Sequence, residues 1–174
     1  MKCVAVGGVP ATGKTTLMRK VINILQPKQE LSYGLVRGML IEDIAILGVY
    51  KDNEIFAGTD KLSMAVQKHF DQYVAKKHKH LIFEGDRLFT KNNLLNLTET
   101  HDCKIIVLKS DEKTLHQRHI DRNDTQNDRF LKSRETKIRN ICDEPELQNY
   151  IEYFSLKDHQ QSEELAKEII DFIS

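Results

Sequence analysis

The sequence predicts an α/β fold with three layers, in which a parallel sheet has helices on both faces. Short apolar runs at 2–7, 81–84 and 103–108 have the length of buried strands, and an expected helix follows each run. A glycine-rich turn joins the first such strand to the first helix. Alternation of this kind is typical of parallel sheets, where ligands bind at the carboxyl ends of the strands.

That glycine-rich turn carries a known pattern. Residues 8–15 read GVPATGKT, which matches the phosphate-binding loop G-x-x-x-x-G-K-[ST], also called Walker A. The apolar residues before the loop suit a buried strand, and residues 16–25 after it have helical spacing, so the structural context that the pattern requires is present. Because motif, strand and helix agree, we expect a nucleotide-phosphate site rather than a chance glycine-rich turn.

The chemistry of such a loop follows from its backbone. Glycines allow N–H groups to turn inward around an anion, and the next helix presents its positive end to that anion. Lys14 is expected to reach the β- and γ-phosphates, and the Thr15 hydroxyl to ligate Mg²⁺. The loop residues expected to bind the cofactors ATP and Mg²⁺ are Gly8, Ala11, Thr12, Gly13, Lys14, Thr15 and Thr16.

Length, charge and cysteine content limit the remaining possibilities. The 174 residues, without repeats or long linkers, predict a single domain over 1–174. The net charge is zero, so overall electrostatics give no reason to expect non-specific DNA binding. The three cysteines have no metal-type spacing and no apolar run could cross a bilayer, which predicts a cytoplasmic protein with no membrane partner. The oligomeric state is not readable.

The other elements follow in chain order. Further strands are expected at about 44–50 and 150–154. Helices are expected at about 62–77, around the leucines of 88–97, at 129–141 and at 161–173, and a further helix is expected to be capped by residues 110–112 and to run to about 122. Residues 26–30, which contain a proline, are expected to form a loop. The basic segment at about 118–141 is expected to form a short helical lid.

A phosphate-binding loop alone does not identify the reaction. The guanine-reading sequence Asn-Lys-x-Asp is absent, which argues against a switch GTPase and favours ATP. A motor ATPase would usually end its acidic strand in Asp-Glu, whereas here Glu84 and Asp86 are separated by Gly85. The short chain and its late arginine-rich segment fit a small kinase better.

A kinase also needs a carboxylate for the acceptor's proton, a Mg²⁺ anchor and positive charge. Asp60 is the favoured base, with Asp86 and Glu84 as Mg²⁺ or water ligands, although exchanging the roles of Asp60 and Asp86 contradicts nothing in the sequence. Asp60 could equally be the N-cap of the helix that follows it.

Arg134 is the favoured source of positive charge. It falls in the apolar stripe of the 129–141 helix, where a guanidinium is costly unless it meets an anion. The anion would be the ATP phosphates, if the helix closes as a lid, or the carboxylate of an internal salt bridge. Arg118 and Arg122 on the preceding helix are the next candidates for binding ATP.

The whole chain resembles the P-loop nucleoside and nucleotide kinase superfamily. Residues 47–50 (LGVY), 58–64 (GTDKLSM), 83–88 (FEGDRL) and 130–137 (FLKSRETK) are more narrowly similar to bacteriophage kinases that phosphorylate the hydroxymethyl group of 5-hydroxymethyluracil in phage DNA, a step in DNA hypermodification. This resemblance implies a three-layer P-loop kinase-like fold, a host-cytoplasmic location and Asp60 as the base. The substrate-handling residues it implies are Ser63, Arg87, Arg129, Lys132 and Lys137. The superfamily also implies that the 157–159 loop lies near adenine.

Three other functions stay open at this point. A kinase of free nucleotides, nucleosides or small metabolites would use the same machinery without DNA contacts. A polynucleotide kinase would phosphorylate the ends of ordinary DNA. A non-catalytic nucleotide-binding module would bind ATP without turnover. The zero net charge argues against a DNA substrate. An enzyme that modifies a base in DNA must flip the base or bind single strands, which requires a basic track, and only the 118–139 region offers one.

Overall fold

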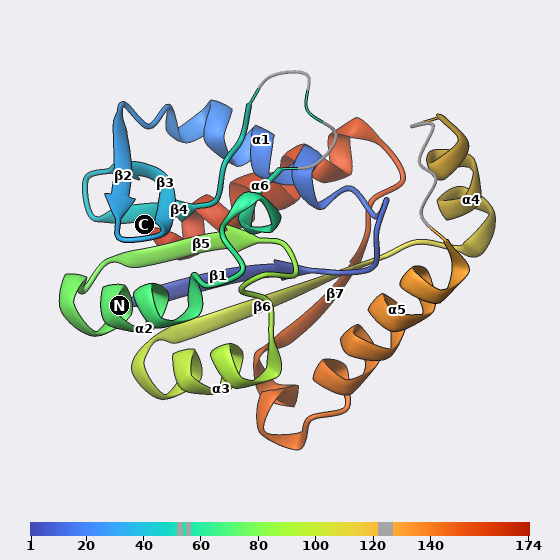
Figure 1. The fold of residues 1–174 in the computed structure, drawn as a ribbon. Coiled ribbons are helices and arrows are strands. Elements are labelled where there is room, and N and C mark those ends of the chain that lie inside the picture. Colours follow the sequence, from blue (N-terminus) through green and yellow to red (C-terminus); the bar gives the residue numbers. More distant parts are fainter. Residues whose placement is uncertain (52–53, 55–56, 122–126) are drawn as a thin grey trace.

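One twisted sheet forms the centre of the molecule (Figure 1). The computed structural model describes residues 1–51, 54, 57–121 and 127–174. Within these residues the sheet has seven strands in the order β2-β3-β4-β5-β1-β6-β7. They are β1 Lys2–Gly7, β2 Gln29–Tyr33, β3 Val36–Ile41, β4 Ile44–Leu47, β5 His80–Glu84, β6 Asp102–Lys109 and β7 Ile151–Ser155.

The expected parallel sheet is confirmed for five neighbouring strands. β4, β5, β1, β6 and β7 run parallel, with Cys3 of β1 in register with Leu81 of β5 and Cys103 of β6. Residues 3–7 of β1 are all buried. Such near-continuous apolar strands are buried on both faces because helices cover both sides of a parallel sheet.

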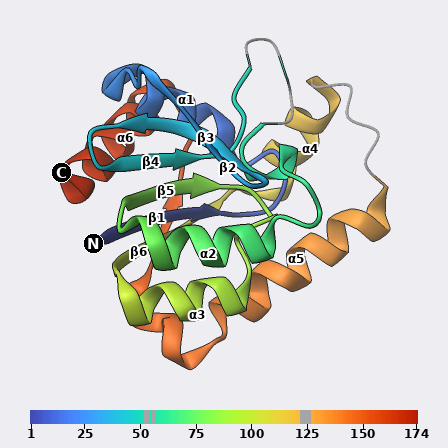
Figure 2. The same ribbon diagram turned by 60° about the vertical axis from the view of Figure 1, so that its left-hand side comes forward.

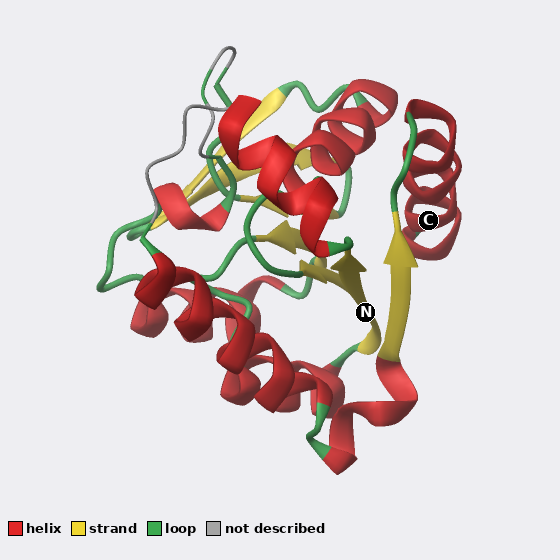
Figure 3. Cartoon of the chain, turned by 90° about the vertical axis from the view of Figure 1, so that its right-hand side faces the viewer, coloured by secondary structure: helices red, strands yellow, loops and turns green. Residues whose placement is uncertain are grey.

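Helices form the two outer layers (Figures 1 and 2). Within the described residues the α-helices are α1 Lys14–Leu25, α2 Gln67–Lys77, α3 Lys91–Thr100, α4 Glu112–Asp121, α5 Asp128–Cys142 and α6 His159–Ile173. Helices α1 and α6 pack on one face of the sheet, while α2, α3 and α5 lie on the other. Two short 3-10 helices, η1 Thr59–Lys61 and η2 Pro145–Tyr150, connect elements at the sheet's ends (Figure 3). None of the helices in the described part of the chain has the length and apolarity needed to cross a bilayer.

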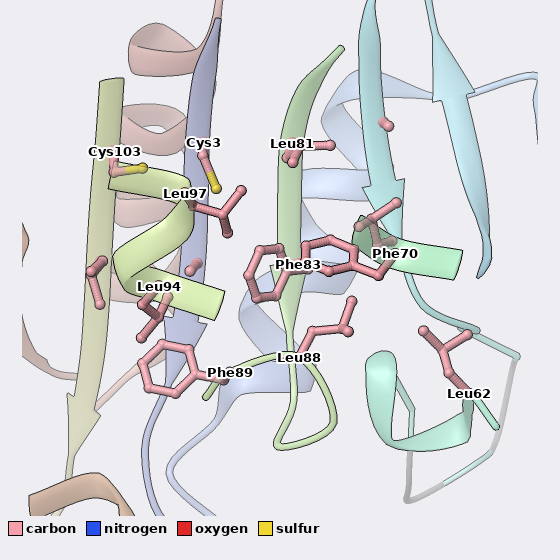
Figure 4. Packing of buried hydrophobic residues seen from close by; sticks show 14 of the residues in the cluster. Cys3, Leu62, Phe70, Leu81, Phe83, Leu88, Phe89, Leu94, Leu97 and Cys103 are labelled. Carbon is pink, nitrogen blue, oxygen red and sulfur yellow. The ribbon is translucent and has the colours of Figure 1, made fainter. Parts of the chain in front are cut away.

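The core under α2 and α3 holds the two central strands in place (Figure 4). The rings of Phe70 and Phe83 meet edge to face with their centroids 6.2 Å apart. Phe89, just after β5, packs against the end of β1 so closely that a Cβ on Gly7 would lie 2.2 Å from its ring. This contact fixes the carboxyl ends of β1 and β5 relative to each other, which is where the candidate site lies.

The structure differs from the sequence-based expectation at one edge of the sheet. β4 ends at Leu47 rather than Tyr50, because Gly48 has φ +117° and leaves the extended conformation. An antiparallel hairpin of β2 and β3 was not expected. β2 begins at Gln29, inside the stretch read as a loop, and four of its five residues are not buried, so it has no apolar run to detect.

The helix expected at 62–77 is shorter than predicted. α2 begins only at Gln67, and residues 59–61 form the separate turn η1. The later elements agree more closely, since α5 covers Asp128–Cys142, β7 Ile151–Ser155 and α6 His159–Ile173. Of the expected lid, α4 and α5 are described, while residues 122–126 lie outside the described residues.

Candidate active site

The phosphate-binding loop connects β1 to α1 at the carboxyl edge of the sheet. Gly8, Ala11 and Gly13 have φ values of 138°, 66° and 100°, which turn the backbone in a way that glycine tolerates best. The Thr12 hydroxyl donates to the carbonyl oxygen of Val9 at 2.9 Å and closes the loop on itself. The loop thus has the compact, strained backbone expected of an anion-binding nest.

The two polar residues that end the motif reach in different directions. Lys14 Nζ donates to the carbonyl oxygens of Gly8 and Val9, at 2.8 and 3.0 Å, so its ammonium lies over the loop. The Thr15 hydroxyl donates to Oε1 of Glu84 at 3.0 Å. The loop and the end of β5 therefore present an ammonium, a hydroxyl and a carboxylate together.

Glu84 is almost completely buried, with 1% of its surface exposed. A Cβ on Gly58 would lie 2.5 Å from Glu84 Oε1, so the Gly58 backbone packs directly against the carboxylate. Burial raises the pKa of Glu84 to about 7, with smaller opposing contributions from Lys14 and the Thr15 hydrogen bond and a further rise from Asp60. A cation bound beside Glu84 would favour the ionised carboxylate and offset the free-energy cost of its burial.

Asp60 lies in the turn η1 and is not the N-cap of α2, whose N-cap position is Val66. Its Oδ1 accepts the backbone N–H of Arg87 at 3.1 Å, and the Thr59 hydroxyl donates to Gly85 O at 2.9 Å. These bonds attach η1 to the chain that follows β5. Desolvation raises the pKa of Asp60, the nearby Asp86 raises it further, and Lys14 and Arg134 act in the opposite direction.

Asp86 is held by two basic side chains of α5. Its Oδ2 lies 3.1 Å from Arg134 Nε, and its Oδ1 lies 3.7 Å from Lys137 Nζ. Lys137 also donates to the backbone carbonyl of Asp86 at 2.6 Å, and desolvation lowers the pKa of this lysine. Arg134 stacks on the ring of Phe130 at 4.6 Å. The internal salt bridge that the sequence left open as an alternative for Arg134 is therefore present.

The remaining residues expected at the substrate side lie less close together. Arg87 contacts the Met64 sulfur through Nη1, and its buried Nε has no hydrogen-bond partner among the described residues. Ser63 is exposed, and its hydroxyl accepts the N–H of Ala65 at 3.2 Å. Arg129 and Lys132 are exposed on α5. Of this predicted group, Arg87 and Lys137 are the two joined to the Asp60–Asp86 cluster by hydrogen bonds.

Arg118 links three segments at the other end of the loop. Its guanidinium donates to Ala11 O and Leu156 O, each at 3.0 Å, and to the Ser110 hydroxyl at 3.3 Å. It therefore joins the phosphate-binding loop to the segment between β7 and α6. Arg122, the other arginine expected here, lies outside the described residues.

A cavity of about 370 Å³ opens between these segments. It is lined by the phosphate-binding loop, α1, Arg118 and the 156–162 segment: Ala11, Thr12, Gly13, Thr16, Lys20, Arg118, Leu156, Lys157, Asp158, His159 and Ser162. The sequence interpretation included the 157–159 loop but not Lys20, Leu156 or Ser162. None of the three belongs to a motif, so no local pattern could have identified them.

Comparison with known proteins adds little to this geometry. No protein-family model matches the sequence, and no curated protein matches it either. Among solved structures the chain is similar to shikimate kinase from Acinetobacter baumannii in complex with shikimate. That match has a TM-score of 0.48 and 16% sequence identity, and it covers 99% of this chain and 93% of the other. Similarity at this level supports no conclusion about what this chain binds or does.

Proposed function

We propose that this protein is an ATP-dependent kinase that transfers the γ-phosphate to a hydroxyl group of a small molecule. One observation carries the proposal: the Thr15 hydroxyl and Glu84 carboxylate meet at 3.0 Å beside Lys14, at the strand edge that also holds Asp60 and Asp86. Beside a phosphate-binding loop, phosphoryl transfer requires a Mg²⁺ anchor, a carboxylate for the acceptor's proton and positive charge, and side chains of each kind lie at this edge.

Thr15 and Glu84 would hold the metal. A hydroxyl and a carboxylate are hard oxygen donors, and such donors suit Mg²⁺, which keeps most of its own water ligands. Bound Mg²⁺ would neutralise charge on the β- and γ-phosphates. Asp86 could supply a further oxygen through water, although its carboxylate is already shared with Arg134 and Lys137.

Asp60 is assigned as the general base. Its Oδ1 accepts only a backbone N–H, and within the described residues no basic side chain lies within salt-bridge distance of it, whereas Asp86 is paired with two cations. Its raised pKa brings it closer to the range in which a base works best. Asp60 would therefore take the proton of the attacking hydroxyl.

Three basic side chains would contribute to phosphate binding. Lys14 would leave the loop carbonyls and bind the β- and γ-phosphate oxygens, as its place in the motif predicts. Arg134, held at the site by Asp86, would face the transferring group. Arg118 would contribute by holding the loop against the 156–162 segment.

A small-molecule acceptor is favoured over DNA by the charge balance of α5. Arg134 and Lys137, which the DNA interpretation needs for a basic track, both pair with Asp86. The exposed Arg129 and Lys132 alternate with the exposed acids Asp128 and Glu135, so this face of α5 has little net charge. The narrower alternative, 5-hydroxymethyluracil in phage DNA, rests on sequence resemblance alone.

Transfer from γ-labelled ATP to a panel of acceptors tests the proposal. The panel contains free nucleosides, nucleotides and hydroxyl-bearing metabolites, DNA with 5-hydroxymethyluracil, and ordinary DNA. We expect label on a small molecule, with a shallow dependence of acceptor binding on salt. Label only on the modified DNA, with the steep salt dependence of phosphate contacts, would overturn the small-molecule assignment but not the kinase. Label on ends of ordinary DNA would indicate a polynucleotide kinase.

A further inference from the structure

Arg19 is a half-buried arginine of α1 that the proposed reaction does not use. Its Nη2 donates to the backbone carbonyl oxygens of Lys51 and Glu54, each at 2.9 Å. Thr15 lies four residues earlier, and residues four apart share one face of a helix. This face of α1 therefore makes two contacts. Thr15 binds Glu84, and one turn further on Arg19 binds the chain that follows β4.

The Arg19 guanidinium is engaged by backbone carbonyls rather than by an acid. In the part of the chain that the structure describes, no carboxylate lies within salt-bridge distance of it. Hydrogen bonds from a charged donor are about twice as strong as those between neutral groups, and here one nitrogen joins two carbonyls three residues apart. A guanidinium placed in this way holds a backbone segment in position.

The chain that Arg19 holds returns to the proposed metal ligand. Val49 and Gly58 form an isolated antiparallel bridge, with N–H···O distances of 3.0 and 2.9 Å. A Cβ on Gly48 would lie 2.4 Å from the carbonyl carbon of Gly58, so the two ends of this chain pack backbone to backbone. Gly58 packs in turn against Glu84 Oε1, and η1 begins at the next residue.

Glu54 connects Arg19 to η1 through its side chain. Lys61 Nζ lies 3.1 Å from Glu54 Oε2, and Lys61 is the last residue of η1. Because the backbone carbonyl of Glu54 also accepts from Arg19, this one residue joins α1 to η1. The connection ends one residue from Asp60, the proposed general base. The other hydrogen bonds of η1 attach it to the chain after β5, so α1 is its second support.

We propose that Arg19 is a positioning residue for phosphoryl transfer. It holds the chain before η1 on α1, and it thereby fixes Asp60 relative to the phosphate-binding loop, from which α1 begins. This inference rests on the proposed function, since it takes Asp60 as the general base. A misplacement of about 1 Å can lower the rate of a reaction about 100-fold when the reacting groups must be aligned. A residue outside the reacting groups can therefore control the rate.

Arg19→Met removes the guanidinium and keeps an aliphatic side chain, and it is tested in the wild type and in Asp60→Asn. Transfer from γ-labelled ATP to the acceptor that the panel identifies gives kcat and KM, and calorimetry gives the affinity for MgATP. In the wild type we expect Arg19→Met to lower kcat by about 10- to 100-fold, with MgATP affinity within about 2-fold. In Asp60→Asn no base remains to be positioned, so the same change should lower kcat by less than about 2-fold.

Two further variants separate positioning from stability. Arg37→Met is the matched control, because Arg37 Nη1 also donates to two backbone carbonyls, those of Gly34 and Val36, but within the β2–β3 hairpin. Its kcat should equal that of the wild type. Arg19→Lys keeps a charged donor and should retain more of kcat than Arg19→Met. The lysine variant carries the comparison between the two backgrounds if the methionine variant does not fold.

The outcomes distinguish this inference from the proposed function. An equal fall in kcat in the wild type and in Asp60→Asn would overturn the inference, because it would show a general structural effect. Unchanged kcat in Arg19→Met would also overturn it and leave the kinase intact. Full activity in Asp60→Asn would remove the base that Arg19 is proposed to position. Absence of transfer by the wild type to every acceptor of the panel would overturn the proposed function itself, and the inference with it.

Discussion

The Thr15 hydroxyl donates a 3.0 Å hydrogen bond to Oε1 of Glu84 and so joins two segments that are 69 residues apart. Thr15 is the second residue of α1, directly after the phosphate-binding loop, and Glu84 is the last residue of β5. The bond holds the two proposed metal ligands together. Burial of the ionised Glu84 carboxylate costs folding free energy, and for this reason its pKa rises to about 7.

The pKa of Glu84 predicts a specific pH dependence of stability. Because its pKa in the fold exceeds its ordinary value of 4.5, the stability associated with the protonated form is complete below about pH 4.5 and is lost as the pH rises through about 7. Glu84→Gln is always neutral. We expect the metal-free variant to exceed the wild type in unfolding free energy by up to about 3 kcal/mol near pH 8. Near pH 4.5 the unfolding free energies of the variant and the wild type should be nearly equal. Urea unfolding near pH 4.5 and near pH 8 measures the difference between the two proteins. An equal difference at both pH values would contradict the raised pKa of Glu84.

Asp60→Asn should remove the general base. We expect kcat to fall by about 10²- to 10⁴-fold, as for other general bases, with nucleotide affinity nearly unchanged. The wild-type rate should fall on the acid side as Asp60 becomes protonated, at a pH above its ordinary pKa of 3.8, because desolvation and Asp86 raise that pKa. The control is Asp86→Asn, in which this acid limb should move to lower pH. A larger rate loss in Asp86→Asn than in Asp60→Asn would exchange the two roles.

Arg134→Ala should affect rate far more than stability. The Arg134 and Asp86 side chains are 30% and 21% exposed, and partly exposed ion pairs contribute at most about 1 kcal/mol to stability. The loss of positive charge at the transferring phosphate should lower kcat by about 100-fold. Arg129→Ala, on the exposed side of the same helix, is the matched control and should change neither kcat nor the melting temperature. A large fall in melting temperature with the rate preserved would make Arg134 a purely structural residue.

Gly58→Ala should disturb the metal ligands through the backbone. Gly58 has φ +77°, and an added Cβ would lie 2.5 Å from Glu84 Oε1. Relieving both the strained backbone and the clash should cost at least about 2 kcal/mol of unfolding free energy. We also expect weaker binding of MgATP. Unchanged stability and unchanged MgATP binding in this variant would show that Gly58 does not hold Glu84 in place.

Local signals made the centre of the fold predictable from sequence. β1, β5 and β6 are buried on both faces and therefore read as apolar runs, and the phosphate-binding motif is contiguous. The β2–β3 hairpin could not be predicted in this way, because its exposed edge strand needs few apolar residues. The start of α2 was placed too early, because Leu62 and Val66 are buried and lie four residues apart, as in a helix, but both precede Gln67, where α2 begins.

The site was predictable as a set of residue types but not as a set of contacts. Glu84 and Asp86 were proposed as site residues from their place at the end of an expected strand, Asp60 from its place before an expected helix, and Arg134 from its position on an apolar stripe. The pairing of Arg134 with Asp86, and of Arg118 with Ala11 and Leu156, joins segments with no shared pattern. Ser162, which lines the cavity beside the loop, had no sequence signal, because only the folded chain brings it to that cavity.

The most direct test of the central claim compares the wild type with Lys14→Ala in the transfer of label from γ-labelled ATP to the acceptor panel. The account predicts that the wild type labels a hydroxyl-bearing small molecule. It predicts that Lys14→Ala, which keeps the fold but loses the ammonium that reaches the β- and γ-phosphates, transfers at least about 100-fold less. No transfer by the wild type to any acceptor, or full activity in Lys14→Ala, would contradict the assignment of this site to phosphoryl transfer.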